Sequence, residues 1–198
     1  MSVTPLCRNL FISSMENALV AGGWLDRPLR ALWRISSRGR GWSGFDAALI
    51  CVSGGISEPT LLARHNVTML VGSPLRTTAA CEGVVASRAQ EPGTFDVLPA
   101  RSTVSWVDEG SSLFLAVGMD HELICETAFE MGVEPNAVSF VPRLTCRDPR
   151  IEHLLWALKA ELESVEPQGR LYADSLGVAL ASQLVRRNVR AVPHSRSG

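Results

Sequence analysis

The chain has 198 residues, of which 46% are hydrophobic and 20% are charged, and its formal net charge is −1. This length is enough to bury a sizeable core, as one large domain or two small ones. The composition excludes a disordered chain, and no window holds the roughly 20 consecutive apolar residues that a membrane helix needs. Glu16 and Asn17 interrupt the apolar run near the start, so we expect no signal peptide and a cytoplasmic location.

The charges are unevenly distributed along the chain. Residues 1–40 carry six arginines and two acidic residues, 41–185 carry eighteen acidic and nine basic residues, and 186–198 carry four arginines without an acidic residue. An acidic centre lacks the basic face that phosphate groups require, so we expect no direct binding to nucleic acid. The short basic end, 188–198, is expected to be a disordered, solvated tail.

The elements can be taken in chain order. Residues 1–32 predict an irregular lead, and the region after it contains short apolar and β-branched runs separated by turn signals. These runs are 46–53, 66–72, 83–88, 94–98, 103–107 and 113–118. Short strands at this spacing favour an antiparallel sandwich or barrel over a parallel sheet, which would need helical crossovers. A short helix is expected over 120–131, before Gly132.

Residues 148–187 predict two helices. Asp148 is a suitable N-cap and Pro149 suits the first helical position, where its missing N–H costs nothing. Apolar residues at helical spacing continue to Val165, and a second helix is expected from about Leu171 to Arg187. The two would form an antiparallel helical hairpin whose apolar surface packs on the strands or on a second subunit. The leucines expected at such a dimer interface are Leu154, Leu158, Leu176 and Leu180.

Motifs for catalysis or metal binding are missing from the sequence. The histidines, His65, His121, His153 and His194, are scattered and form no H-x-H or H-E-x-x-H pattern. The glycines match neither a Walker A loop nor a dinucleotide fingerprint, and no nucleophile elbow is present. The five cysteines include no C-x-x-C pair. We therefore expect no metal, no cofactor and no enzymatic activity.

The most informative segment runs from Glu91 to Arg101, with the sequence EPGTFDVLPAR. Its Pro-Gly pair predicts a tight turn, and Pro99 ends strand pairing because it has no N–H to donate. The spacing from Gly93 to Pro99 resembles the second conserved box of cupin barrels. Metal-binding cupins continue with a Gly and a His, where this chain has Arg101 and Val104. The first cupin box is also unmatched, so the resemblance implies a metal-free, cupin-like antiparallel β-barrel.

With its flanking motifs, the chain resembles the N-terminal regulatory domain of AraC-family bacterial transcription regulators. The matching pieces, in order, are RGWSG at 40–44, His65, PGTFDVLPA at 92–100, Trp106, DPRIE at 148–152, AEL at 160–162 and GRLYADSL at 169–176. The resemblance implies an α+β fold, with a ligand-binding barrel over 33–147 and a dimerisation hairpin over 148–187. The family binds DNA through a C-terminal domain with two helix-turn-helix motifs, for which the eleven residues after Arg187 leave no room.

The resemblance therefore implies a ligand-sensing and dimerisation domain that does not itself bind DNA. It predicts a small organic effector whose binding site is lined by His65, Arg101 and Trp106. It also predicts a homodimer, or a mixed dimer with a full-length family member. Trp106 is alternatively a core aromatic, and Arg101 a solvated residue. Two other functions stay open. One is a metal-free, cupin-like isomerase or epimerase, for which His65 with Glu82 is the pair to nominate; the other is a truncated regulator without a role of its own.

Overall fold

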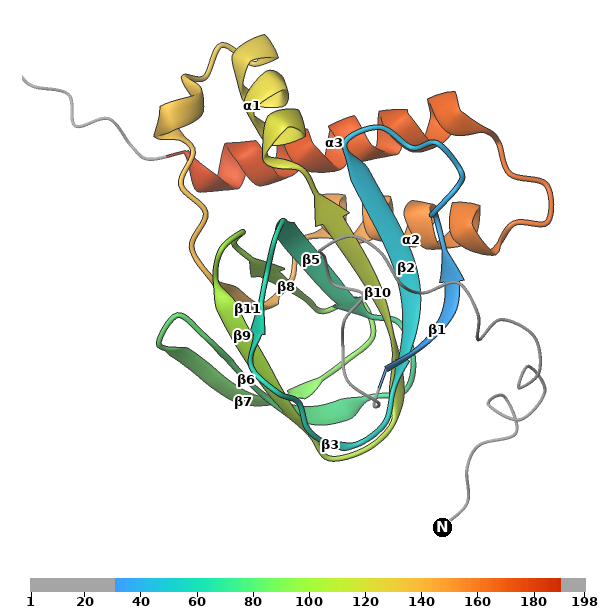
Figure 1. Cartoon of the computed structure of the whole chain (residues 1–198), viewed down its shortest axis with the longest axis vertical. Helices are drawn as coiled ribbons and strands as arrows, with labels where there is room; N and C mark the ends of the chain where they lie inside the picture. The colour runs from blue at the N-terminus through green and yellow to red at the C-terminus, as the bar shows by residue number, and fades with distance from the viewer. Residues whose placement is uncertain (1–30, 190–198) are drawn as a thin grey trace, which may run out of the picture.

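Two antiparallel sheets face each other in the computed structural model, which describes residues 31–189 (Figure 1). The first sheet has six strands, in the spatial order β1 (Ala31–Ser36), β2 (Phe45–Val52), β10 (Ser112–Met119), β5 (His65–Leu70), β8 (Phe95–Leu98) and β11 (Arg143–Cys146). The second has five strands: β3 (Gly55–Ile56), β9 (Thr103–Asp108), β6 (Leu75–Cys81) and β7 (Val84–Gln90) in that order, with β4 (Thr60–Leu61) also paired to β9.

This strand order is that of a double-sheet jelly roll, the architecture to which cupins belong. The chain crosses repeatedly from one sheet to the other, so that β2 and β3 lie in different sheets, as do β5 and β6, and β9 and β10. The expected antiparallel, cupin-like fold is confirmed as a β-sandwich of two sheets. The predicted lead, 1–32, and tail, 188–198, lie almost entirely outside the described residues.

Three α-helices complete the described chain: α1 (His121–Glu130), α2 (Pro149–Glu163) and α3 (Arg170–Asn188), with a short 3-10 turn at Pro135–Ala137. Both α1 and α2 pack against α3 (Figure 1). Asp148 caps α2 as expected, because its Oδ1 accepts a hydrogen bond of 2.9 Å from the Arg150 backbone N–H. Within the described residues, no helix is both long and apolar enough to cross a membrane.

The largest apolar cluster lies between the six-stranded sheet and the helices. It includes Leu49, Val67 and Leu115 from the strands, together with Leu155 and Leu184 from the helices. Alternate residues of the same strands face the second sheet, where Ile50, Leu70 and Phe114 form a separate cluster. The side-chain period of two thus gives the six-stranded sheet one face toward the helices and one toward the sandwich interior.

The leucines assigned to a dimer interface lie in or against this core of the single chain. Leu158 and Leu180 are 0% exposed, so they offer no surface to a second copy. Leu154 and Leu176 are partly buried and pack against the same cluster. A helical stripe identifies the buried face of a helix without saying which neighbour buries it, and for Leu158 and Leu180 that neighbour is the core of the same chain.

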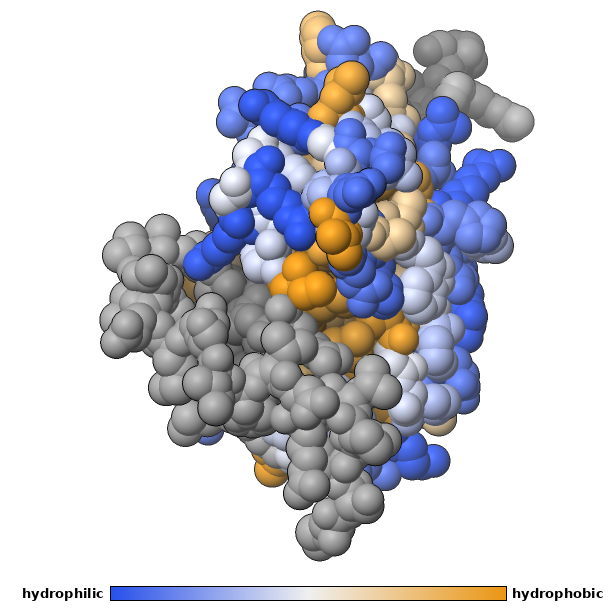
Figure 2. All heavy atoms as spheres, turned by 90° about the vertical axis from the view of Figure 1, so that its right-hand side faces the viewer, coloured by the Kyte–Doolittle hydropathy of each residue, from blue (hydrophilic) through white to orange (hydrophobic). Residues whose placement is uncertain are grey.

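Two residues assigned to the apolar stripes are instead exposed. Val165 follows the end of α2 and is 96% exposed, and Leu171, in the first turn of α3, is 83% exposed. Figure 2 shows the side of the molecule that carries the connection between α2 and α3, where apolar and hydrophilic residues are mixed. The buried face of α3 is formed instead by residues including Ala173, Leu180 and Leu184.

Candidate functional site

A belt of polar side chains crosses the interior of the sandwich. On the six-stranded sheet, Thr68 of β5 lies opposite Asp96 of β8. On the other sheet, Thr77 of β6 lies opposite both Arg88 of β7 and Asp108 of β9. All five side chains project into the sandwich. Thr68, Thr77 and Asp108 each lie two residues from a side chain of an interior apolar cluster, so they share its face of the strand. Asp96 and Arg88 lie directly opposite Thr68 and Thr77 on the neighbouring strands, so they project the same way. We call these five residues the inner polar belt.

An ion pair between Arg88 and Asp96 joins the two sheets within this belt. The two side chains are only 8% and 4% exposed. The Asp96 carboxylate also accepts a 2.8 Å hydrogen bond from the backbone N–H of Thr145, which adopts a left-handed conformation with φ of 62°. Burial raises the pKa of Asp96, and the Arg88 guanidinium and this N–H oppose the rise. The pair therefore depends on each partner being present.

Polar atoms without hydrogen-bond partners gather in and beside the belt. Gln90 lies two residues beyond Arg88, and Asn66 two residues before Thr68, and both are 1% exposed. Four side-chain atoms of these residues and their strand neighbours are buried without a hydrogen-bond partner. They are Asn66 Oδ1, Thr68 Oγ1, Arg88 Nε and Gln90 Nε2. Each such group costs about 1–3 kcal/mol if it stays unpaired. Folded proteins pair nearly all such groups, so this arrangement indicates water or a ligand between the sheets.

Small residues lie beside these polar atoms. Ala116 of β10 is flanked by Ala48 on one side and by Thr68 on the other. Gly118 lies opposite Asn66, and a Cβ atom there would come within 2.7 Å of Asp46 Oδ1 and 3.3 Å of Asn66 Oδ1. Alanine and glycine at these positions leave the middle of this sheet without large apolar side chains, whereas Ile50, Leu70 and Phe114 fill the next row.

The sequence-predicted ligand residues are distributed over three different places. Trp106 lies on the inner face of β9, two residues before Asp108, and packs in an interior apolar cluster with 8% exposure. Arg101 is exposed on the turn between β8 and β9, with φ of 65°. The structure therefore brings Trp106 next to the inner polar belt and does not bring Arg101 there.

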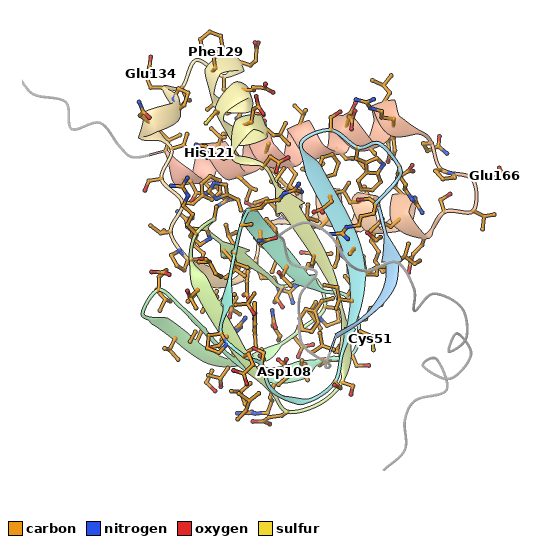
Figure 3. The ribbon with its side chains drawn as sticks, viewed as in Figure 1. Cys51, Asp108, His121, Phe129, Glu134 and Glu166 are labelled. Carbon is orange, nitrogen blue, oxygen red and sulfur yellow. The ribbon has the colours of Figure 1, made fainter. Side chains whose placement is uncertain are left out.

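His65 lies on the opposite face of β5 from Thr68, toward the helices. Its Nδ1 accepts a hydrogen bond of 3.2 Å from the Ala100 backbone N–H, and its ring lies 4.3 Å from that of Phe140. Its Nε2 lies 3.4 Å from His121 Nδ1. Figure 3 shows His121 at the base of α1, at the other end of the sandwich from Asp108. His65 is thus a packed residue beneath α1 and not part of the sandwich interior.

The hydrogen bonds of His65 also define its chemistry. Burial, and secondarily the neighbouring His121, lower the pKa of His65 to about 4, so the ring is neutral near pH 7. Since Nδ1 accepts from an amide, the single ring proton lies on Nε2, which has no lone pair left for a metal. Glu82, its proposed catalytic partner, is exposed and accepts a hydrogen bond from the Thr103 N–H instead. Within residues 31–189, no group of three His, Cys, Asp or Glu residues could hold a metal ion.

Sequence reasoning missed the residues of the inner polar belt. A signal was present: Asn66 and Thr68 alternate with His65, Val67 and Met69, and Asp96 interrupts the apolar run from Phe95 to Leu98. Polar residues at every second position of an otherwise apolar strand indicate one polar face. Such a face is normally assigned to solvent, and only the second sheet places it in the interior.

Replacing His65 by glutamine is expected to make the free energy of unfolding fall less steeply as the pH is lowered. Between about pH 6.5 and pH 4 the unfolded chain binds a proton at His65 that the folded chain does not, so the free energy of unfolding falls as the pH falls. The contribution lost across this window is at most about 3 kcal/mol. Urea unfolding of both proteins at a series of pH values measures it. An equal pH dependence in the two would contradict the buried, neutral state of His65.

Comparisons with known proteins identify no family. No family model and no curated protein matches the chain. Among solved structures, it is similar to a putative mannose-6-phosphate isomerase from Ralstonia eutropha JMP134 (23% identity, 52% of this chain and 99% of that one, TM-score 0.38). It is also similar to an oxalate decarboxylase variant from Bacillus subtilis (18%, 56% and 35%, 0.39) and to the Cnp3 cupin domain from Schizosaccharomyces pombe (11%, 52% and 69%, 0.34).

These likenesses are too low to bear on activity. The TM-scores lie between 0.34 and 0.39, and the chain spans only about a third of the oxalate decarboxylase. The assignment of a cupin-like sandwich therefore rests on the strand order.

Proposed function

We propose that this chain is a small-molecule-binding domain that holds a neutral, hydroxyl-bearing ligand on the inner polar belt. The observation that carries the proposal is the set of four buried, unpartnered polar atoms, on Asn66, Thr68, Arg88 and Gln90. Thr68 and Asn66 lie beside Ala116 and Gly118, where small residues replace large side chains, whereas Gln90 lies opposite Leu75 in the neighbouring apolar row.

The unpartnered atoms suggest the chemistry of the ligand. Arg88 Nε and Gln90 Nε2 are donors, Asn66 Oδ1 is an acceptor, and the Thr68 hydroxyl can act as either. A molecule with several hydroxyl groups matches such a mixed set, because each hydroxyl both donates and accepts. The charge of Arg88 is already compensated by Asp96, which favours a neutral ligand over an anion. Unphosphorylated sugars and linear polyols fit this description.

Binding is favoured over catalysis by the state of the two carboxylates. Asp96 is held by Arg88 and by Thr145, and Asp108 accepts a 2.6 Å hydrogen bond from the Thr77 hydroxyl. A general base needs a lone pair directed at the substrate, and His65 lies on the far face of β5. A metal-free isomerase is the second candidate function, because it would need two acidic groups close together in the interior. Burial is the main cause that raises the pKa of Asp96, and the nearby charge of Asp108 adds to it.

The resemblance to AraC-family regulatory domains supports a sensing role for such a domain. Under this proposal, the ligand is an effector, and the helices that follow the strands transmit its binding to a homodimer or to a full-length family member. The partner surface would have to use exposed residues of α3, such as Leu171 and Val178, since Leu158 and Leu180 are buried. Sedimentation of the purified chain with and without ligand bears on this part of the proposal.

Replacing Thr68 by valine is expected to weaken ligand binding about fivefold without unfolding the protein, since one neutral hydrogen bond contributes about 1 kcal/mol. A thermal-shift screen of unphosphorylated pentoses, hexoses and polyols identifies the ligand, and titration calorimetry measures the affinity. Thr78→Val is the matched control, because the Thr78 hydroxyl is exposed on the outer face and bonds to Ser87.

Three results of this screen are decisive. If no neutral hydroxylated compound binds, the proposed ligand class is wrong. If Thr68→Val and Thr78→Val weaken binding equally, the ligand does not bind at the inner polar belt. Recovery of an isomer of the added sugar, detected by NMR of the released ligand, would favour the isomerase over the sensing domain.

A further inference from the structure

A second candidate site lies on the other face of the six-stranded sheet, where a cavity of about 130 Å³ opens between β8, β11 and the helices. Its apolar wall includes Phe95 and Val97 of β8 and Leu184 of α3. Because Phe95 and Val97 flank Asp96 on β8, their side chains project away from the inner polar belt. The cavity is therefore separated from the proposed effector site by the thickness of the sheet.

Three arginines, Arg143, Arg147 and Arg187, line this cavity. Arg187 pairs with the buried carboxylate of Asp148, and Arg147 lies 3.9 Å from Glu152. Arg143 forms no ion pair with any acidic side chain among residues 31–189; its Nη2 donates a 2.7 Å hydrogen bond to the Arg187 backbone oxygen. The cavity thus has three guanidinium groups and two nearby carboxylates, with a net positive charge that attracts an anion.

Asn188 contributes an unpartnered acceptor to the same cavity. It is 5% exposed, and its Nδ2 donates a 2.7 Å hydrogen bond to the Leu184 backbone oxygen. Its Oδ1 is buried and accepts no hydrogen bond. Exchanging the two amide atoms would place Oδ1 against the Leu184 oxygen, so the present orientation is the favourable one. A ligand that satisfies Asn188 must therefore supply an O–H or N–H donor.

We infer that this cavity binds a short-chain hydroxycarboxylate. The carboxylate would meet Arg143, the hydroxyl would donate to Asn188 Oδ1, and the carbon chain would pack on the apolar wall. An ammonium donor is disfavoured by the three neighbouring guanidinium groups. The volume is close to the roughly 150 Å³ of an engineered cavity that holds benzene, which sets the size of the ligand.

The test is titration calorimetry on the full chain with four probes: 2-hydroxybutanoate, butanoate, 1,2-butanediol and inorganic phosphate. We expect 2-hydroxybutanoate to bind, butanoate to bind about fivefold more weakly for want of one hydrogen bond, and the uncharged diol to show no binding. Hydrogen exchange adds an independent readout: the ligand is expected to slow exchange in the last turn of α3, which carries Arg187 and Asn188.

Arg143→Met is expected to weaken binding of 2-hydroxybutanoate about tenfold or more, because a charge-assisted hydrogen bond is lost. Arg186→Met is the matched control, since Arg186 is exposed in the same helix turn and does not line the cavity. Three results would each overturn the inference: equal affinity for butanoate and 2-hydroxybutanoate, tighter binding of phosphate, or no binding of any probe. The comparison of probes uses the parent protein, so it stands even if a variant fails to fold. Thr68→Val is expected to leave this binding unchanged, whereas loss in that variant alone would place the probe on the inner polar belt.

Discussion

Replacing Arg88 by methionine is expected to destabilise the protein by about 3–5 kcal/mol, the cost of removing one partner from a buried ion pair. The remaining carboxylate of Asp96 is buried and would lie unpaired between the two sheets. Burial already raises its pKa, so without Arg88 we expect it to bind a proton at higher pH than in the parent protein. Denaturant unfolding at neutral pH, followed by circular dichroism, measures the loss.

Arg76→Met provides the control for this prediction. Arg76 lies on β6, and it pairs with Glu109 at 3.5 Å while both side chains are about two thirds exposed. An exposed pair contributes about 0–1 kcal/mol. Adding Asp96→Asn to Arg88→Met is expected to restore part of the stability, because the uncompensated charge is removed. If the two arginine variants lost equal stability, or if the second substitution restored nothing, the ion pair would not hold the sheets as described.

Replacing Leu180 by alanine is expected to cost about 2–5 kcal/mol of unfolding free energy. Leu180 is 0% exposed on α3 and belongs to the cluster between the helices and the six-stranded sheet. Removing its side chain leaves a cavity that the surrounding residues fill only in part, and the cost should not depend on protein concentration. Urea unfolding at several protein concentrations tests both statements.

Leu171→Ala is the matched control on the same helix, because Leu171 is 83% exposed. We expect it to change the unfolding free energy of the single chain by less than about 0.5 kcal/mol. A destabilisation by Leu180→Ala that disappears at high protein concentration would instead support the dimer interface expected from the sequence. The comparison therefore separates packing within one chain from packing between two.

The two candidate sites share one strand. Thr145 of β11 donates its backbone N–H to Asp96 at the inner polar belt, and Arg143 of the same strand lines the outer cavity. Arg143 also holds the last turn of α3 through the Arg187 backbone oxygen. If a ligand on the belt displaces Asp96, β11 is the connection through which the end of α3 would respond, in keeping with the proposed sensing role.

The sequence predicted elements with strong local signals and missed those without them. The cap at Asp148 and the apolar spacing after it predicted α2, and alternating or continuous apolar runs predicted β2, β5 and β10. By contrast, β6 (LRTTAAC) was missed, because its inward face carries a threonine and an alanine where an apolar pattern would be expected. The candidate site was missed for a different reason: Thr68, Arg88 and Asp96 lie on strands that the sequence did predict, but their polar face was expected to meet solvent and not a second sheet.

By itself, the sequence determined the antiparallel class of the fold, the two C-terminal helices and the turn at Pro92-Gly93, because each depends on residues close together in the chain. Only the tertiary structure decided which face each side chain serves. His65 and Thr68 lie on the same short strand, yet one packs beneath α1 and the other faces the second sheet. Leu158 and Leu180 have helical spacing suited to a dimer, yet the chain buries both against itself. Periodicity defines the faces of an element, whereas the neighbour on each face is set by contacts between residues distant in the chain.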